Sequence, residues 1–217
     1  MTTFRWNGHG TGFVLWDDPA NWLPNGIPGV GSAVGADVLI HSAVLADLYN
    51  AGVVPTSVHN LQVTGQSATV VAEVSNSRGT LDVTGALVLT NAVYFEEDTS
   101  VIGPVGNPGT QSALLLGNSL LSVDQGSMTV HGMVDATNSR IEVGRSAAAT
   151  FTAGSARDQG STWTLDQGAA VSFSGTVYGI GDTFNLTGTM FSELSFGNQG
   201  TEFTGDIKLA AVATSLT

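Results

Sequence analysis

The stretch Leu121-Ser-Val-Asp-Gln-Gly126 is one copy of a short pattern that recurs along the chain. In each copy two apolar residues flank a polar one, and a glycine follows within a few positions. Such alternation places every second side chain on one face of a β-strand, and the glycine lets the chain turn by adopting a positive φ. The copies begin at Leu61, Leu81, Leu121, Ile141, Trp163 and Phe184.

The starting positions of neighbouring copies differ by 20 at first, and by 21 or 22 toward the C-terminus. A missing copy is expected at Val101, where the chain reads Val101-Ile-Gly-Pro-Val-Gly106. Self-similarity at a fixed period of this size is typical of solenoids, in which stacked turns about 4.8 Å apart satisfy each other's backbone hydrogen bonds. We therefore predict an all-β, single-stranded β-solenoid (a parallel β-helix of right-handed type) with turns of about 20–22 residues.

The composition also favours strands and turns over helices. Charged residues make up 11% of the 217 residues and hydrophobic residues 42%, and there are 28 glycines. Lysine and arginine together number only 6, too few for helix surfaces. The net charge of −12 argues against nucleic-acid binding. The sequence has no cysteine, no bilayer-length apolar run and no N-terminal secretion signal, so we expect no membrane insertion.

Residues 1–40 differ from the repeats and are predicted to form a cap, with the solenoid in residues 41–217 of the same domain. This segment reads Trp6-Asn-Gly, then Trp16, Ala20-Asn-Trp22, Pro24-Asn-Gly-Ile-Pro28 and Asp37-Val-Leu-Ile40. A proline-rich segment anchored by tryptophans would cover the open β-edge of the first turn. The alternative is that Trp6, Trp16 and Trp22 form a platform on which sugar rings stack.

This N-terminal series resembles the opening of the passenger-type β-helical region in bacterial autotransporter-like surface adhesins. The resemblance covers residues 1–40 directly, and the glycine- and valine-rich repeats extend it loosely over the rest. It implies a β-helix within a secreted, adhesive or matrix-forming polypeptide. Because the N-terminus carries no signal sequence, we expect the chain to reach the cell surface or the medium by a route without one.

The C-terminal stretch Ile207-Lys-Leu-Ala-Ala-Val-Ala-Thr-Ser-Leu-Thr217 is apolar, with one charge and no proline. It can leave a β-edge exposed, and one exposed end beside one covered end suits head-to-tail assembly. The alternative is a final turn followed by a frayed tail. The predicted assembly interface comprises Trp6, Trp16 and Trp22 at one end and Ile207, Leu209, Val212 and Leu216 at the other.

Asn118 and Asn138 are one repeat interval apart, and each is followed by a serine. They are candidates for a stacking ladder, in which asparagine side chains hydrogen-bond to one another along a corner of the solenoid. The alternative is that both are exposed turn residues without such a role.

No residues of the sequence suggest a catalytic centre. Asp124 and Asp166 fall at equivalent positions two turns apart, a separation compatible with an inverting pair of carboxylates. Both stand in Asp-Gln-Gly turns, however, and we favour a role in capping the turn. Glu96-Glu97-Asp98 and Asp17-Asp18 are candidate calcium ligands, although an exposed acidic loop is the interpretation we favour. We expect no cofactor other than calcium and no enzymatic activity.

Together these features predict a non-enzymatic extracellular structural protein that self-assembles by end-to-end stacking. The assembly would be a homo-oligomer or filament in a biofilm-like matrix fibre or a bacterial surface layer, in contact with polysaccharide or the cell surface. The alternative is a carbohydrate-binding or polysaccharide-cleaving β-helix, as in a phage spike or a secreted lyase.

Overall fold

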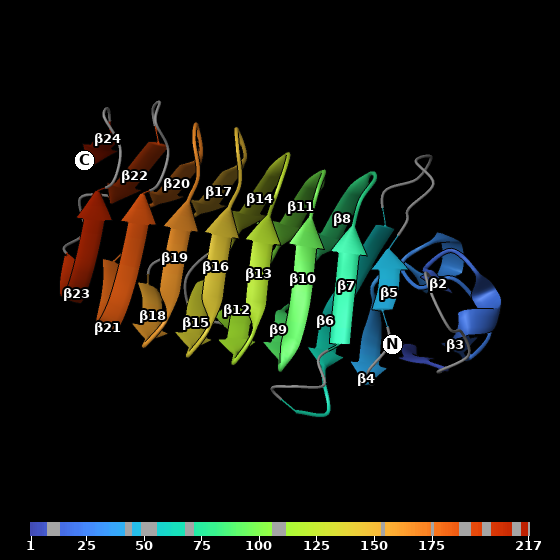
Figure 1. Ribbon diagram of the computed structural model, residues 1–217. Coiled ribbons are helices and arrows are strands. Elements are labelled where there is room, and N and C mark those ends of the chain that lie inside the picture. The colour runs from blue at the N-terminus through green and yellow to red at the C-terminus, as the bar shows by residue number, and fades with distance from the viewer. Residues whose placement is uncertain are drawn as a thin grey trace.

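The chain forms a parallel β-solenoid of about five turns, with about 22 residues in each turn (Figure 1). The computed structural model describes residues 1–7, 14–41, 45–48, 56–67, 72–105, 112–152, 155–174, 176–186, 192–196, 201–209 and 214–216. In the regular turns each strand pairs in parallel with the equivalent strand of the turn before and the turn after. The solenoid fold and turn length predicted from the repeats are confirmed.

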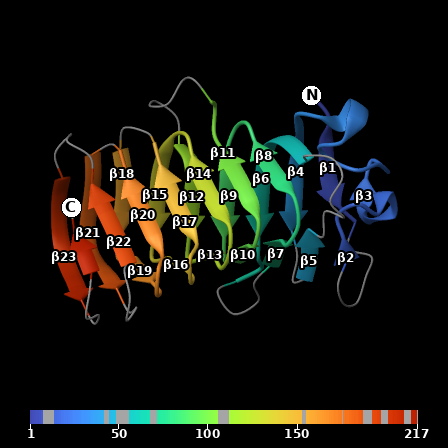
Figure 2. The ribbon, with the colours of Figure 1, turned by 90° about the horizontal axis from the view of Figure 1, so that it is seen from above.

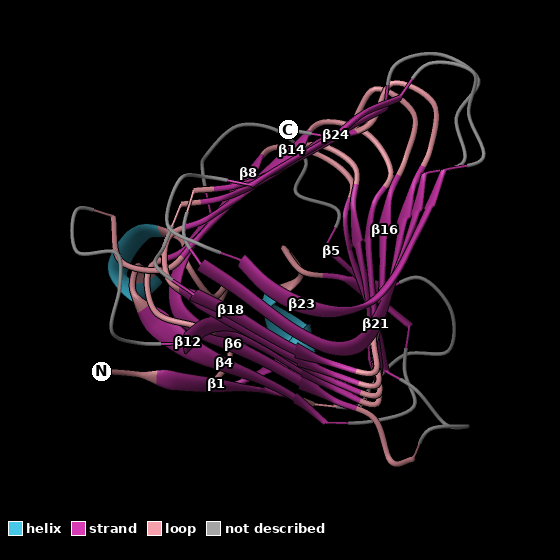
Figure 3. Ribbon diagram, turned by 90° about the vertical axis from the view of Figure 1, so that its left-hand side faces the viewer, coloured by secondary structure: helices cyan, strands magenta, loops and turns pink. Residues whose placement is uncertain are grey.

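Each regular turn consists of three strands, so the stacked turns form three parallel sheets that make three sides when viewed along the axis (Figure 3). The first two turns are β7 (Ala72–Asn76), β8 (Thr80–Val83) and β9 (Leu87–Thr90), then β10 (Ala92–Glu96), β11 (Thr99–Ile102) and β12 (Ser112–Gly117). The next two are β13 (Leu120–Val123), β14 (Ser127–Val130) and β15 (Met133–Thr137), then β16 (Arg140–Val143), β17 (Ala148–Phe151) and β18 (Ser155–Gln159). The fifth is β19 (Thr162–Leu165), β20 (Ala170–Phe173) and the first part of β21 (Thr176–Leu186).

Less regular strands extend the stack in both directions. β4 (Ala36–His41), β5 (Leu45–Leu48) and β6 (Thr56–Thr64) precede the first regular turn. β22 (Ser192–Phe196), β23 (Thr201–Leu209) and β24 (Thr214–Leu216) follow the fifth. As a result the two ends of the chain lie toward opposite ends of the column (Figure 2).

The core consists of inward-facing side chains that stack in columns along the axis. In one of these columns every side chain is 2% exposed or less. Its last two members are aromatic: the rings of Trp163 and Phe184 stack with centroids 5.5 Å apart. Alternation along each strand explains the columns, because every second side chain of a strand faces inward. This column consists of Val74, Tyr94, Leu121, Ile141, Trp163 and Phe184.

The six motif copies do not all lie on one face. The last four share the column just described, but Leu61 is paired with Leu87 and Leu81 is paired with Ser100, on the other two sheets. All three strands of a turn carry the same alternation, so the period of the repeat in the sequence does not by itself identify the face.

The prediction that Val101 begins the missing copy is wrong. Val101 pairs with Asp82 and Thr129 in β11, and it does not face the core. The residue that occupies the column of Leu121 in the preceding turn is Tyr94. The interval from Tyr94 to Leu121 is long because residues 103–111 separate β11 from β12 and break the period.

The N-terminal tryptophans form a small aromatic core, which confirms the Trp/Pro-rich cap. The Trp22 ring lies edge-on to Trp6 and Trp16, with centroids 5.1 and 4.7 Å away. The indole N–H of Trp16 donates to the Pro28 carbonyl (3.0 Å), and that of Trp22 donates to the Trp16 carbonyl (2.8 Å). All three rings are 8% exposed or less, so they are not open to stack on sugars.

Part of the predicted cap already belongs to the β-ladder. β1 (Thr3–Trp6) pairs in parallel with β4, and β3 (Trp22–Leu23) pairs antiparallel with β1 and covers part of its outer edge. β2 (Val14–Leu15) pairs with β5. The helices of the described chain are two short 3₁₀ segments, η1 (Pro19–Asn21) and η2 (Gly31–Ala33), and neither is long or apolar enough to cross a membrane.

Candidate functional site

One corner of the solenoid has a left-handed residue in every regular turn. Asn91, Asn118 and Asn138 have φ of 47° or 48°, and Gly160 and Gly181 take the same place with φ of 65° and 71°. Glycine adopts this conformation freely, and asparagine adopts it more readily than other residues. The recurrent asparagine and glycine therefore bend each turn at the same point.

After four of these five positions, all but Asn91, the next residue faces inward and its side chain bonds to the preceding turn. The Oγ atoms of Ser119, Ser139 and Ser161 accept hydrogen bonds from the backbone N of Ala92 (3.2 Å), Ser119 (3.2 Å) and Ser139 (3.1 Å), and Asp182 Oδ1 accepts one from Ser161 N (2.9 Å). The four accepting side chains are 6% exposed or less. They form a continuous polar ladder that ties successive turns together inside the corner.

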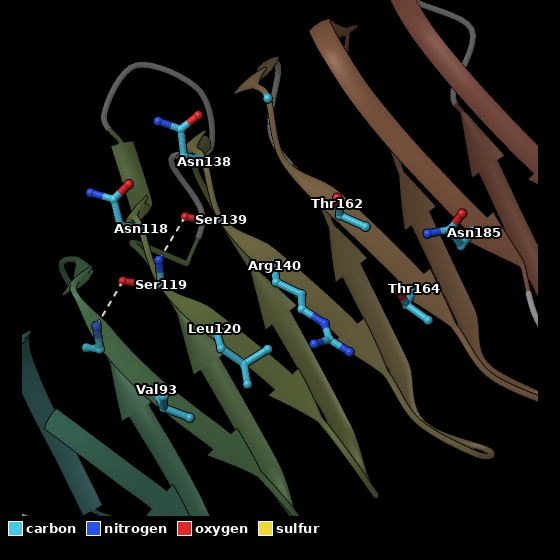
Figure 4. A pocket seen from close by; sticks show the side chains of 12 residues that line it. Val93, Asn118, Ser119, Leu120, Asn138, Ser139, Arg140, Thr162, Thr164 and Asn185 are labelled. Carbon is cyan, nitrogen blue, oxygen red and sulfur yellow. Dashed lines mark hydrogen bonds between the residues drawn. The ribbon is translucent and has the colours of Figure 1, made fainter. Parts of the chain in front are cut away.

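Asn118 and Asn138, the residues predicted to stack, occupy equivalent positions in neighbouring turns. Their side chains are exposed at the outer corner, whereas the bonds between turns that Figure 4 marks end on Ser119 and Ser139. The backbone N of each asparagine also donates to a carbonyl of the next turn, at 3.0 and 2.9 Å. The corner was predictable from the Asn-Ser pairs, but a ladder of the asparagine side chains themselves stays a prediction.

A shallow groove of about 810 Å³ follows the outside of this corner. It crosses β10, β13, β16, β19 and β21, so it runs along the axis of the column rather than along one turn (Figure 4). Its floor includes one register column, Val93, Leu120, Arg140 and Thr162, with the corner asparagines at its margin.

The groove offers hydrogen-bonding groups. Asparagine and threonine side chains both donate and accept; in the lining Asn118 and Asn138 lie one turn apart, about 4.8 Å, and so do Thr164 and Asn185. Arg140 is the charged residue of the lining, and its guanidinium pairs with Glu142 two positions along β16. The described residues that line the groove include neither an acid nor a histidine, so they supply no general acid or base. Such a surface suits an extended, neutral ligand.

The two aspartates considered as a catalytic pair lie at equivalent positions, as predicted. Asp124 follows β13 and Asp166 follows β19, and both are exposed. The backbone N of each donates to a carbonyl of an earlier turn, at 2.8 and 2.9 Å, and the Ser122 hydroxyl also donates to the Asp124 carboxylate. These contacts are those of turn residues.

The acidic candidates for calcium point in different directions. Glu96 is fully buried, Glu97 is exposed, and one carboxylate oxygen of Asp98 accepts the backbone N–H of Gly79 (2.8 Å). Asp18 caps the start of η1. Within the described parts of the chain, no three His, Asp or Glu side chains are grouped so as to hold a metal ion.

A buried polar cluster in the second regular turn was not predicted from the sequence. Glu96 Oε1 accepts from Asn76 Nδ2 (2.9 Å) and from Asp98 N (3.0 Å), while the Tyr94 hydroxyl (3.0 Å) and the Ser100 hydroxyl contact Oε2. Burial raises the pKa of Glu96 to about 7, although these hydrogen bonds partly oppose it. The alternation Ala92, Tyr94, Glu96 was the available signal, because it places the carboxyl on the apolar side of β10.

The predicted assembly residues lie at opposite ends of the column. The tryptophans are inside the cap. Ile207 and Leu209 lie on β23, each in register with a buried residue of an earlier turn, and Leu216 lies on β24. Val212 is outside the described residues. Their role in assembly stays a prediction. The register partners of the three are Phe184, Leu186 and Leu194.

No protein-family model, curated protein or solved structure matches this chain. The β-solenoid fold implied by the resemblance to autotransporter-like passengers is present, and nothing beyond that fold connects the chain to those adhesins.

Proposed function

We propose that the chain is a non-enzymatic structural element that assembles end to end into an extracellular fibre or surface layer. The observation that carries this proposal is the parallel ladder, which runs from β1 to β23 and β24 and ends in strands that have no further partner among the described residues. The free backbone groups of such an edge form hydrogen bonds with another compatible strand. A second copy of the chain can supply that strand.

The difference between the two ends favours a head-to-tail contact. Among the described residues, four of the five exposed large hydrophobic side chains lie in the cap segment, and the fifth is Val105. Apolar side chains on the cap of one copy would lose water on meeting the end of another. A contact between two different surfaces extends without closing, which makes a filament. The four residues of the cap segment are Met1, Leu15, Leu23 and Val34.

Assembly can be tested by sedimentation velocity and negative-stain electron microscopy over a wide range of protein concentration. We expect filaments that lengthen as the concentration rises. The double variant Ile207→Lys/Leu209→Lys, which places charge on β23 in register with the buried Phe184 and Leu186, should stop elongation. The double variant Thr129→Lys/Thr150→Lys is the matched control, because it adds the same charge to half-exposed outer positions of β14 and β17.

Both variants should keep a strand-rich circular dichroism spectrum, which separates a blocked end from an unfolded chain. Discrete particles of the unmodified protein at every concentration would refute the proposal. Filaments that form equally well from the double variant at β23 would exclude that edge as the docking surface.

Binding of a neutral polysaccharide along the corner groove is a second candidate function. The observation in its favour is that two pairs of polar side chains in the groove, Asn118 with Asn138 and Thr164 with Asn185, each lie one turn apart, since a glycan also repeats its hydroxyl groups along its length. Retention on insoluble neutral polysaccharides tests it. Thr162→Glu, in the groove, should abolish retention, whereas Thr150→Glu on another sheet should not. No retention of the unmodified protein would refute the candidate.

A further inference from the structure

Glu96 stands in an inward column that carries the buried Asn76 in the preceding turn and aliphatic side chains in the turns that follow. In the three following turns its column carries Val123, Val143 and Leu165. The Glu96 side chain is 0% exposed, and its four hydrogen-bond partners are uncharged groups. An ionised carboxylate that is buried without a cation is strongly unfavourable. The protonation state of Glu96 therefore matters for the fold.

The oxygen contacts around Glu96 can all be hydrogen bonds only if its carboxyl carries a proton. Tyr94 Oη is 3.0 Å from both Glu96 Oε2 and Ser100 Oγ, and Ser100 Oγ also contacts Oε2. Three oxygens thus make three mutual contacts, and each contact needs one hydrogen. Tyr94 and Ser100 supply one hydrogen each, so the third belongs to the carboxyl. Oε1 already accepts from Asn76 and from Asp98 N, which leaves Oε2 as the protonated atom.

We propose that Glu96 is stored in the core as a neutral carboxylic acid, and that its ionisation loosens the turns around it, so the solenoid is most stable in mild acid. In the neutral form the ring of bonds is closed: Glu96 donates to Ser100, Ser100 to Tyr94, and Tyr94 back to Glu96. Loss of the proton leaves two hydrogens for three contacts and a charge in the apolar interior.

The direction of the pH dependence follows from the two states of the chain. Burial raises the pKa of Glu96 from 4.5 to about 7. The unfolded chain therefore loses this proton near pH 4.5, while the folded chain retains it until about pH 7. Between these values the folded state holds one more proton, so stability falls as the pH rises. The stabilisation is complete below pH 4.5 and is lost above about pH 7.

The other titratable groups near the cluster do not produce this dependence. Tyr94 is the other titratable side chain of the described residues that faces Glu96 in the core, and burial raises its pKa well above 10.0, so it stays neutral in this range. The charged side chains on the adjoining elements stand on outer faces or in turns. They are Glu73 of β7, Arg78 between β7 and β8, Asp82 of β8, Glu97 and Asp98 after β10, and Asp124 after β13.

Urea unfolding of the full chain at a series of pH values tests the proposal. Glu96→Gln keeps the shape of the acid but cannot ionise. Relative to this variant, the unfolding equilibrium constant of the unmodified protein should rise about tenfold for each pH unit between about 5 and 7. Glu97→Gln, which removes a charge from an exposed neighbour, should keep the steep profile. Parallel profiles for the unmodified protein and Glu96→Gln would overturn the proposal.

A second measurement needs no substitution and covers the case in which Glu96→Gln does not fold. Carbon-detected NMR of the glutamate carboxyls should show one resonance with a midpoint near pH 7, well above the unperturbed glutamate value of 4.5. The absence of a glutamate carboxyl with a midpoint near pH 7 would refute the proposal that Glu96 is protonated in the core.

Discussion

Replacing Ser139 with alanine should break the corner ladder at one turn. Ser139 is 5% exposed; its Oγ accepts from Ser119 N (3.2 Å) and donates to the Thr137 carbonyl (2.9 Å). That carbonyl also accepts from Asn118 N (3.0 Å), so it stays satisfied in the variant. The buried N–H of Ser119 loses its acceptor, which costs about 1–3 kcal/mol. We therefore expect Ser139→Ala to lower the free energy of unfolding by about 2 kcal/mol.

Hydrogen exchange at the Ser119 amide and urea denaturation measure this effect locally and globally. A loss of about 2 kcal/mol corresponds to exchange about 30-fold faster at Ser119. Ser172→Ala is the matched control: it removes a hydroxyl from a half-exposed outer position, so it should change stability by less than about 0.5 kcal/mol. If Ser139→Ala leaves both the Ser119 exchange rate and the urea midpoint unchanged, the ladder does not stabilise the corner.

Two further substitutions test the core and the turns. Trp163→Ala removes a 1%-exposed indole stacked on Phe184, so the free energy of unfolding, measured by urea denaturation, should fall by about 3–5 kcal/mol. Thr164→Ala, on the outer surface, should lower it by less than about 0.5 kcal/mol, and equal effects would contradict the columnar core. Gly126→Ala places a Cβ 1.7 Å from the Asp98 carbonyl oxygen at a φ of 75°, so we expect the free energy of unfolding to fall by about 2 kcal/mol or more. Thermal denaturation measures this change, and unchanged stability would mean that the turn rearranges to accept the side chain.

The corner illustrates how far local sequence reasoning reaches. The Asn-Ser pairs at 118 and 138 mark a repeated bend, because asparagine tolerates a positive φ. Which of the two side chains bonds between turns depends on the direction that each takes at the bend, and the structure assigns the bonds to Ser119 and Ser139. In the next turn glycine replaces asparagine at position 160, so the corner loses its sequence signature while keeping its geometry.

Glu96 shows the opposite case, in which local reasoning favoured the wrong surroundings. In the acidic run 96–98 it suggests an exposed loop or a calcium ligand. Its pairing with Asn76 and Val123 places it in an inward column instead. Only contacts from other turns and strands bring Asn76 and Ser100 to its carboxyl.

The solenoid, its turn of about 20–22 residues and the Trp/Pro-rich N-terminal cap were predictable from the sequence, and the structure has turns of about 22 residues. These follow from alternation, glycine spacing and the position of the tryptophans, which are properties of short segments. The tertiary structure alone decided which face each strand occupies, that Tyr94 rather than Val101 continues the column of Leu121, and that a carboxyl lies in the core. The physical reason is that a strand's neighbours belong to turns about 22 residues away, and all three strands of a turn share one alternation.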